Sequence, residues 1–182
     1  REAVKALEVI RVLDVRRGDG TYVTSLEPHL LLEAISFVVD MHDDDSMLEI
    51  FAVRRMLESQ ATGLAATLGT DEAIADLERE VESIDSTVSI EELVEHDIRF
   101  HREIVGMAGN AYLASLIEHL SSQTVRARVW RGLTEGGAVE RTLSEHRAIA
   151  DAIARRDSGL ATSLATAHIA GVERWLRQAA TA

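Results

Sequence analysis

The chain has 182 residues and no cysteine, so it is long enough for one well-buried core, or for one domain with an appendage, and it excludes disulfides and thiolate chemistry. Aromatic residues make up 4% of the chain and proline occurs once, whereas Ala, Leu, Glu and Arg recur throughout, which favours an all-α fold. The net charge of -12 argues against nucleic-acid binding by the chain as a whole. The sequence has no run of about 18 apolar residues and no signal peptide, which predicts a cytoplasmic protein without membrane contact.

The charge is unevenly distributed along the chain. Residues 1–24 carry five basic and four acidic side chains, a net charge of +1, and the remaining residues carry -13. Any contact with nucleic acid should therefore be sought in this first segment.

The first segment is predicted to form a helix followed by a β-hairpin. Ala3, Val4 and Leu7 recur at helical spacing. The segment 16–20 separates two short runs with strand character, and its two glycines around an Asp suit the positive φ angles of a tight hairpin turn. Taken alone, this pattern also fits an ordinary helix–hairpin unit.

Two strings in this segment resemble the end of the winged helix-turn-helix of GntR-family transcription regulators. Residues 1–8, REAVKALE, are similar to the recognition helix, and residues 15–23, VRRGDGTYV, are similar to the wing. Arg11 departs from the family, which usually has a glycine at the end of this helix. The resemblance implies a truncated winged helix, so we expect these 182 residues alone to bind DNA poorly. It also implies that operator DNA is contacted by Arg1, Lys5, Arg16, Arg17, Gly18 and Gly20.

From residue 29 onward, amphipathic helices are predicted to form an antiparallel bundle of six to seven helices. The expected domains are residues 1–25, the winged-helix remnant, and residues 29–180, the helical domain. Five helices are expected at about 29–41, 47–68, 71–84, 112–131 and 138–156. Another should begin at the capping box formed by Ser89 and Glu92 and end at Gly109. The last should run from the turn at Asp157 to about Gln178.

The helix at 47–68 carries apolar residues at helical spacing, which predicts the face that packs into the core. This stripe consists of Ile50, Val53, Leu57, Ala61, Leu64 and Leu68.

A candidate site begins with Asp97 and His101, which are four residues apart and therefore lie on one face of a helix. Phe100, Ile104 and Val105 provide an apolar surface that overlaps this face, so the polar pair is expected to point into the protein. Either a bound metal ion or a mutual hydrogen bond would explain a carboxylate and an imidazole in that position.

Two further histidines are expected to meet across the turn near the end of the chain. His146 and His168 each lie eleven residues from Asp157, which is expected at a tight turn between antiparallel helices. Residues equidistant from such a turn lie at the same height on the two helices. If both side chains face inward, their imidazoles can meet.

Together, Asp97, His101, His146 and His168 provide one carboxylate and three imidazoles. This donor set suits a divalent transition metal, with Zn favoured and Ni, Mn or Fe as alternatives. His146 and His168 could instead be independently satisfied polar residues. The other histidines, without comparable partners, are expected at the surface or an interface: His29, His42, His96 and His119.

The helical region resembles the FCD effector domain that follows the winged helix in the FadR-type branch of the GntR family. The matching strings are VRRMLE at 53–58, DIRFH at 97–101, HRAIADAI at 146–153, Gly109-Asn110 and His168. Many members of that family bind a divalent metal through an Asp-x-x-x-His pair and two later histidines, and all four positions are filled here. The resemblance also suggests that Arg54 lines the effector cavity, where it could bind the carboxylate of an organic acid. The alternative for Arg54 is a surface salt bridge with Glu58.

These observations favour a ligand-responsive, homodimeric transcription regulator that binds operator DNA, rather than an enzyme. The alternative is a metal-dependent enzyme acting on a small organic acid. The sequence offers it no convincing general base, because Glu95 and Glu145 adjoin the candidate ligands and should point away from the metal. A third possibility is a metal with a purely structural role in a domain that only dimerises.

Overall fold

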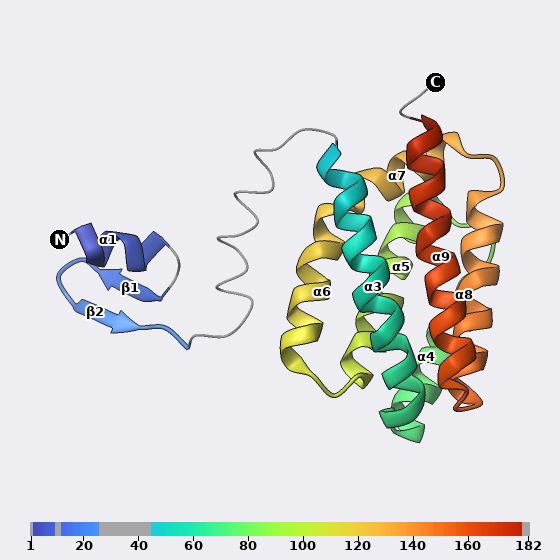
Figure 1. The fold of residues 1–182 in the computed structure, drawn as a ribbon, viewed down its shortest axis with the longest axis horizontal. Coiled ribbons are helices and arrows are strands. Elements are labelled where there is room, and N and C mark those ends of the chain that lie inside the picture. The colour runs from blue at the N-terminus through green and yellow to red at the C-terminus, as the bar shows by residue number, and fades with distance from the viewer. Residues whose placement is uncertain (1, 10–11, 26–44, 180–182) are drawn as a thin grey trace. The chain divides into compact units, whose positions relative to one another are not determined.

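The computed structural model describes residues 2–9, 12–25 and 45–179. They fall into two compact units, divided after Ser46 (Figure 1). Arg1, the helix expected at 29–41 and the domain boundary expected between residues 25 and 29 lie outside the described residues. The two expected domain ranges therefore stay a prediction.

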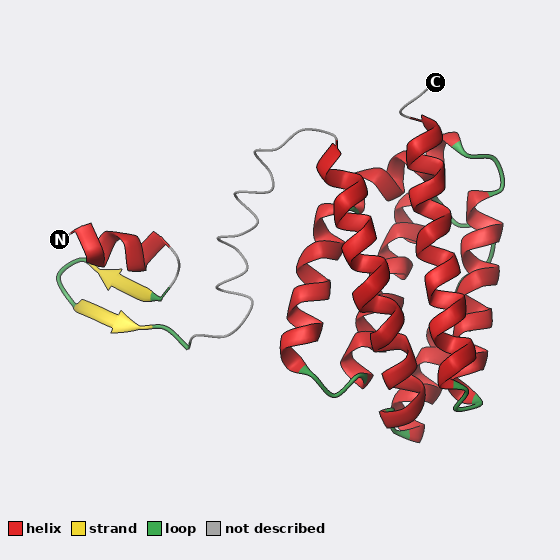
Figure 2. Cartoon of the chain, viewed as in Figure 1, coloured by secondary structure: helices red, strands yellow, loops and turns green. Residues whose placement is uncertain are grey.

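The first unit contains the predicted helix and hairpin (Figure 2). Helix α1 (Glu2–Val9) precedes strands β1 (Leu13–Arg16) and β2 (Gly20–Val23), which pair antiparallel with Arg16 opposite Gly20. Gly18 has φ +82° and Gly20 has φ +148°, in the region that favours glycine. The arginine-bearing turn of the hairpin thus forms as the sequence predicts.

The second unit is a helical bundle, as expected (Figure 1). Within the described residues its helices are α3 (Asp45–Leu68), α4 (Asp71–Glu82), α5 (Ile90–Met107), α6 (Ala111–Gln123), α7 (Val125–Thr134), α8 (Ala138–Ala154) and α9 (Ser158–Ala179). Side-chain caps mark several starts: Thr70 caps α4, Ser89 and Glu92 form a capping box on α5, and the Asp157 carboxylate accepts from the Leu160 N–H at the start of α9.

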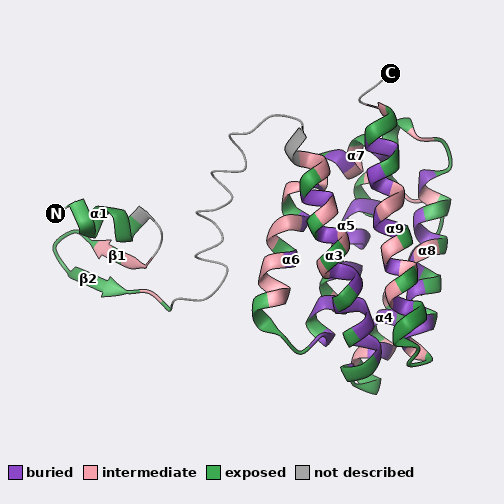
Figure 3. Ribbon diagram, viewed as in Figure 1, coloured by how far each residue is buried: buried purple, intermediate pink, exposed green. Residues whose placement is uncertain are grey.

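Helix α5 lies at the centre of this unit and packs against α4, α6, α7 and α8, while α8 and α9 pack together as an antiparallel pair. Buried residues line the inward faces of the helices and exposed residues the outward faces (Figure 3). The main apolar cluster includes Leu77, Phe100, Ile104, Ile149, Ile153 and Ala161. The central helix is the one that carries Asp97 and His101.

The single helix predicted at 112–131 is wrong, because the chain forms α6 and α7 with a break at Thr124. The Thr124 N–H bonds the Ser121 carbonyl, three residues back, instead of continuing the α-helical pattern. Its hydroxyl donates to the same carbonyl at 2.9 Å and accepts from Arg54 Nη1 at 2.6 Å. The break is therefore fixed partly by a side chain of another helix, which the local sequence does not reveal.

The core stripe predicted on α3 is only partly correct. Ile50 and Ala61 are buried, but Val53, Leu64 and Leu68 are 38%, 40% and 55% exposed. The helix instead buries polar side chains: Arg54, Glu58, Ser59 and Thr62. Burial of these groups is tolerated because Arg54 and Glu58 pair with each other, and the hydroxyls of Ser59 and Thr62 donate to backbone carbonyls one turn back.

Among the described residues, no helix is both long and apolar enough to cross a membrane.

Candidate metal and effector site

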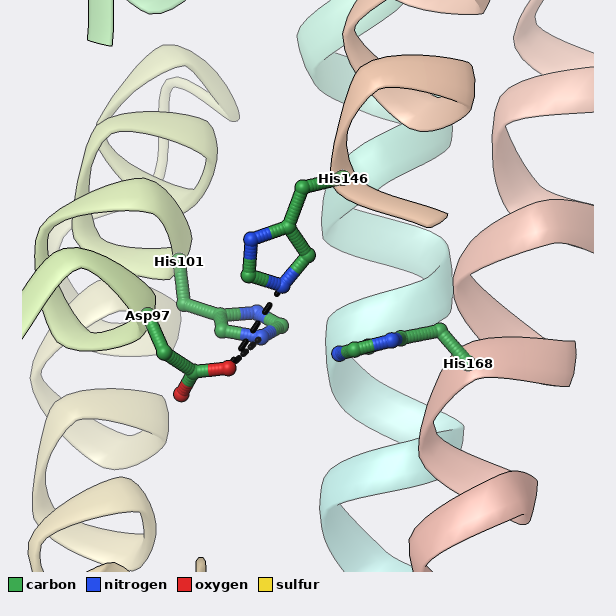
Figure 4. Close-up of side chains that lie close together, drawn as sticks. All are labelled: Asp97, His101, His146 and His168. Carbon is green, nitrogen blue, oxygen red and sulfur yellow. Dashed lines mark ion pairs between the residues drawn. The ribbon is translucent and has the colours of Figure 1, made fainter. Parts of the chain in front are cut away.

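The structure brings the four predicted donors together from three helices (Figure 4). Helix α5 supplies Asp97 and His101, α8 supplies His146, and α9 supplies His168. All four are buried, and one ligand atom of each lies within 4.8 Å of the others. The rings of His146 and His168 lie 4.9 Å apart between centroids, so the expected meeting across the α8–α9 turn is confirmed.

One oxygen of Asp97 faces two of the imidazoles. Asp97 Oδ1 lies 3.7 Å from Nε2 of His101 and 3.5 Å from Nε2 of His146, too far for good hydrogen bonds. Nε2 of His146 is fully buried and has no hydrogen-bond partner among the described residues. Such an atom normally finds a partner, and a metal ion at the centre of the four donors would supply one.

Electrostatics and burial keep two of the donors, Asp97 and His146, in the protonation states that a metal requires. Burial by itself would raise the pKa of Asp97, but Arg128, which donates to Asp97 Oδ2, and then His101 hold that pKa well below its usual range. Burial lowers the pKa of His146 well below its usual value. The carboxylate is therefore ionised and this imidazole neutral near pH 7, the forms that bind metals.

His101 is held in place by a buried ion pair on α3. Its Nδ1 lies 2.9 Å from Glu58 Oε2, and Arg54 donates to both oxygens of Glu58, at 2.5 and 3.2 Å. Burial would raise the pKa of Glu58, yet Arg54 and His101 lower it to about 2. Because an ionised carboxylate only accepts, Nδ1 of His101 donates to it, and in the neutral imidazole the unprotonated nitrogen is then Nε2, the atom on the side of Asp97.

His168 has an equivalent partner on the neighbouring helix. Its Nδ1 lies 2.6 Å from Glu145 Oε2. Glu145 is not one of the four clustered donors, but it contacts the far side of one of them. Residues 145 and 168 lie at nearly equal distances from the α8–α9 turn, and this spacing could have revealed the contact.

The surface position expected for His96 is wrong. His96 is 0% exposed, with Nε2 3.0 Å from His146 Nδ1 and Nδ1 2.9 Å from Glu80 Oε1 on α4. Its position four residues before the buried Phe100 places it on the same inward face, a signal present in the sequence.

A small cavity with a free volume of about 30 Å³ is lined by three of the four donors, Asp97, His101 and His168. Arg54 lines this cavity, and its effector-binding role stays a prediction. The salt bridge with Glu58 forms, but the surface location expected for it is wrong, because both side chains are buried. Sequence reasoning missed two more arginines of this cavity, Arg128 and Arg131. Arg128 also donates to the Ser121 carbonyl at 2.6 Å.

The candidate DNA-contacting residues lie in the first unit and are exposed where the structure describes them. Lys5 lies on α1, and Arg16, Arg17, Gly18 and Gly20 lie at the hairpin turn. Arg16 donates to Asp14 at 2.9 Å and lies over the Tyr22 ring. Arg1 is outside the described residues.

Comparison with known proteins identifies the family. Residues 49–171 match the model of the FCD domain. The chain is 31% identical to the HTH-type transcriptional regulator LutR of Bacillus subtilis, over 95% of this chain and 81% of that protein. It is 27% identical to the galactonate operon transcriptional repressor of Escherichia coli, over 98% of this chain and 80% of that protein.

A solved structure described as Streptococcus agalactiae GntR superposes with a TM-score of 0.64 and 25% identity, covering 96% of this chain and 80% of that one. The named relatives are transcription regulators, which decides against the enzyme alternative. This chain belongs to the GntR family of transcription regulators that carry an FCD domain.

Proposed function

We propose that this regulator binds a divalent transition metal through Asp97, His101, His146 and His168, and that a small carboxylate effector binds beside that metal. The observation that carries the proposal is the buried cluster of four donors, in which Nε2 of His146 has no hydrogen-bond partner among the described residues. Zn is favoured by the nitrogen-rich donor set, with Ni, Mn or Fe as alternatives. A bound cation would supply positive charge and open positions for a carboxylate oxygen.

The cavity chemistry supports an anionic effector. Arg54, Arg128 and Arg131 line it, and a guanidinium can bind a carboxylate through two parallel hydrogen bonds. The free volume of about 30 Å³ is far below the roughly 300 Å³ and above of small-molecule sites. Binding of an organic acid would therefore move these arginines. The name of one relative refers to galactonate, a hydroxylated carboxylate, which agrees with an effector of this class.

Movement of the arginines offers a route for the signal. Arg54 bonds Thr124 and Arg128 bonds the Ser121 carbonyl, so both hold the break between α6 and α7. An effector that draws either guanidinium toward itself would loosen this break. To act as a switch, the effector must bind one arrangement of the bundle more favourably than the other by about 1–3 kcal/mol.

On the DNA side, we propose a cytoplasmic homodimer whose two winged helices bind a two-fold symmetric operator. The basic residues of the first unit would contact mainly phosphates. The proposed contacts are Arg1, Lys5, Arg16, Arg17, Gly18 and Gly20. Sedimentation at twice the chain mass of 20.0 kDa would support the dimer, and a monomer at micromolar concentration would contradict it.

Elemental analysis of the purified chain tests the metal site. We expect near-stoichiometric metal in the wild type and in a His119→Ala control, whose histidine lies outside the cluster, and none in the Asp97→Ala/His168→Ala variant. Thermal unfolding of the metal-loaded protein with a panel of mono- and dicarboxylates then tests the effector class. At least one acid should raise the melting temperature of the wild type and not of the variant.

Two results would contradict the proposal in different ways. Absence of metal from the wild type, even after reconstitution with each candidate ion, would remove the metal site. Full metal occupancy with no response to any acid would leave a structural metal in a dimerisation domain.

A further inference from the structure

His96 is a buried histidine that the proposed donor set does not use. It lies on α5 beside Asp97 but is not one of the four clustered donors, and each of its ring nitrogens has a partner. Nε2 lies 3.0 Å from Nδ1 of His146 on α8, and Nδ1 lies 2.9 Å from Oε1 of Glu80 on α4. Three helices thus contribute to one chain of hydrogen bonds, Glu80–His96–His146, called the relay below.

The protons in the relay can be assigned by counting donors and acceptors. Glu80 also accepts from Arg99 Nε at 3.0 Å, so its carboxylate is an acceptor and Nδ1 of His96 must donate to it. A neutral His96 then has only a lone pair at Nε2, which accepts the proton on Nδ1 of His146. The reverse order would place a lone pair of His96 against the carboxylate of Glu80.

The proton of His146 therefore lies on Nδ1, the nitrogen that faces His96. With its proton on Nδ1, the nitrogen that remains unprotonated is Nε2, the atom that faces Asp97 Oδ1 at 3.5 Å. Phe100 stacks on the same ring at 3.9 Å between centroids and 10° between planes, and so fixes its plane. In the other two donor imidazoles, Nδ1 contacts a carboxylate directly, His101 with Glu58 and His168 with Glu145. Their Nε2 atoms are therefore also the ones available to a metal.

We propose that His96 and Glu80 are positioning residues of the metal centre, which hold His146 in the tautomer and orientation that present Nε2 to the metal. This inference rests on the metal site proposed above. Substitution of a residue that hydrogen-bonds a metal ligand without contacting the metal commonly lowers the metal affinity by about 10–100-fold. Without His96, Nδ1 of His146 would face a buried space without an acceptor, and its proton could move to Nε2 and block ligation.

The first test is the Zn²⁺ affinity of the full chain, measured by competition with a chelator. We expect His96→Ala and His96→Phe to bind Zn²⁺ about 10–100-fold more weakly than the wild type. His96→Phe keeps an aromatic ring beside Phe100 but has no acceptor. His96→Gln can place an amide oxygen near the position of Nε2, so it should recover most of the affinity. A role limited to packing would give the opposite ranking of the Phe and Gln variants.

Ile104→Ala is the matched control for folding. Ile104 is buried on the same helix and is apolar, so this variant should lose stability while its Zn²⁺ affinity stays as in the wild type. Glu80→Gln should weaken Zn²⁺ binding less than His96→Ala does, because the amide oxygen still accepts from His96. Equal Zn²⁺ affinity in the wild type, His96→Ala and His96→Phe would overturn the proposal.

The second test needs no metal and separates the relay from the metal site. Imidazole ¹⁵N shifts of the chelator-treated chain, assigned with single histidine variants, report which nitrogen of His146 carries the proton. We expect Nδ1–H in the wild type and in His96→Gln, and a mixture or Nε2–H in His96→Phe. Nε2–H in the wild type would overturn the relay even if Zn²⁺ binds. Nδ1–H that depends on His96 would support it even if the wild type bound no metal.

Discussion

At the scale of single residues, a charged pair lies in the interior of the protein and positions groups of the candidate site. Arg54 and Glu58 are 2% and 1% exposed and lie one helical turn apart on α3. Glu58 holds His101, while Arg54 holds Thr124 and faces the cavity. Each charge depends on the other, because removal of one partner leaves the other buried without compensation.

Arg54→Ala should therefore lower the free energy of unfolding by about 3–5 kcal/mol. Arg155→Ala is the control, since Arg155 pairs with Asp151 at 3.0 Å but both side chains are more than half exposed, and such pairs contribute less than about 1 kcal/mol. Urea denaturation with chelator present measures both without interference from metal. The double variant Arg54→Met/Glu58→Leu should recover much of the loss, and similar losses for Arg54→Ala and Arg155→Ala would contradict this explanation.

At the scale of elements, close packing of α3 against α9 depends on a glycine. A Cβ on Gly63 would lie 2.3 Å from Thr162 Oγ1 and 3.3 Å from the Ser158 carbonyl oxygen. Thr162 cannot turn away freely, because its hydroxyl donates to that same carbonyl at 2.8 Å. The helix propensity of glycine is poor, so its presence inside α3 is explained by this contact.

Gly63→Ala should therefore destabilise the protein by about 1–3 kcal/mol, since the clash outweighs the gain in helix propensity. Gly106 in α5 is the matched control, because a Cβ there meets nothing within 4 Å. Gly106→Ala should stabilise the protein by about 0.5–1 kcal/mol. Thermal or urea unfolding distinguishes the two, and a gain at both positions would refute the close α3–α9 contact.

At the scale of the whole molecule, the candidate site exists only when the helical unit is folded. Its donors come from α5, α8 and α9. Carboxylates on α3 and α8 contact two of the imidazoles, and Glu80 on α4 reaches the third through His96. An unfolded chain offers the same side chains without this arrangement. A metal that binds the site will therefore favour the folded state.

We expect the free energy of unfolding to rise with free Zn²⁺ by about 1.4 kcal/mol for each tenfold increase above the dissociation constant, reaching about 2.7 kcal/mol at a hundredfold excess. Urea denaturation at buffered Zn²⁺ concentrations provides the measurement. The Asp97→Ala/His168→Ala variant should show no such rise. An equal rise in this variant would mean that Zn²⁺ stabilises the fold from elsewhere.

The sequence by itself determined the features that depend on local spacing. Helix ends followed from caps such as Thr70, Ser89 and Asp157, because a cap and the backbone group it bonds lie within three residues of each other. The grouping of Asp97 with His101 followed from the helical repeat, and that of His146 with His168 from their equal distance to one turn. All of these patterns depend on spacing along the chain, so they can be recognised without knowing which helices pack together.

Tertiary structure alone decided what lies opposite each side chain. Arg54 bonds Thr124 and Glu58 contacts His101, so both residues join α3 to helices that are distant in sequence, and Glu80 joins α4 to His96 on α5. A buried polar side chain is stabilised by a partner, and the partner's position is set by helix packing rather than by spacing along the chain. For this reason the sequence identified the four candidate donors, while the groups that orient His101 and His146 were identified only in the folded bundle.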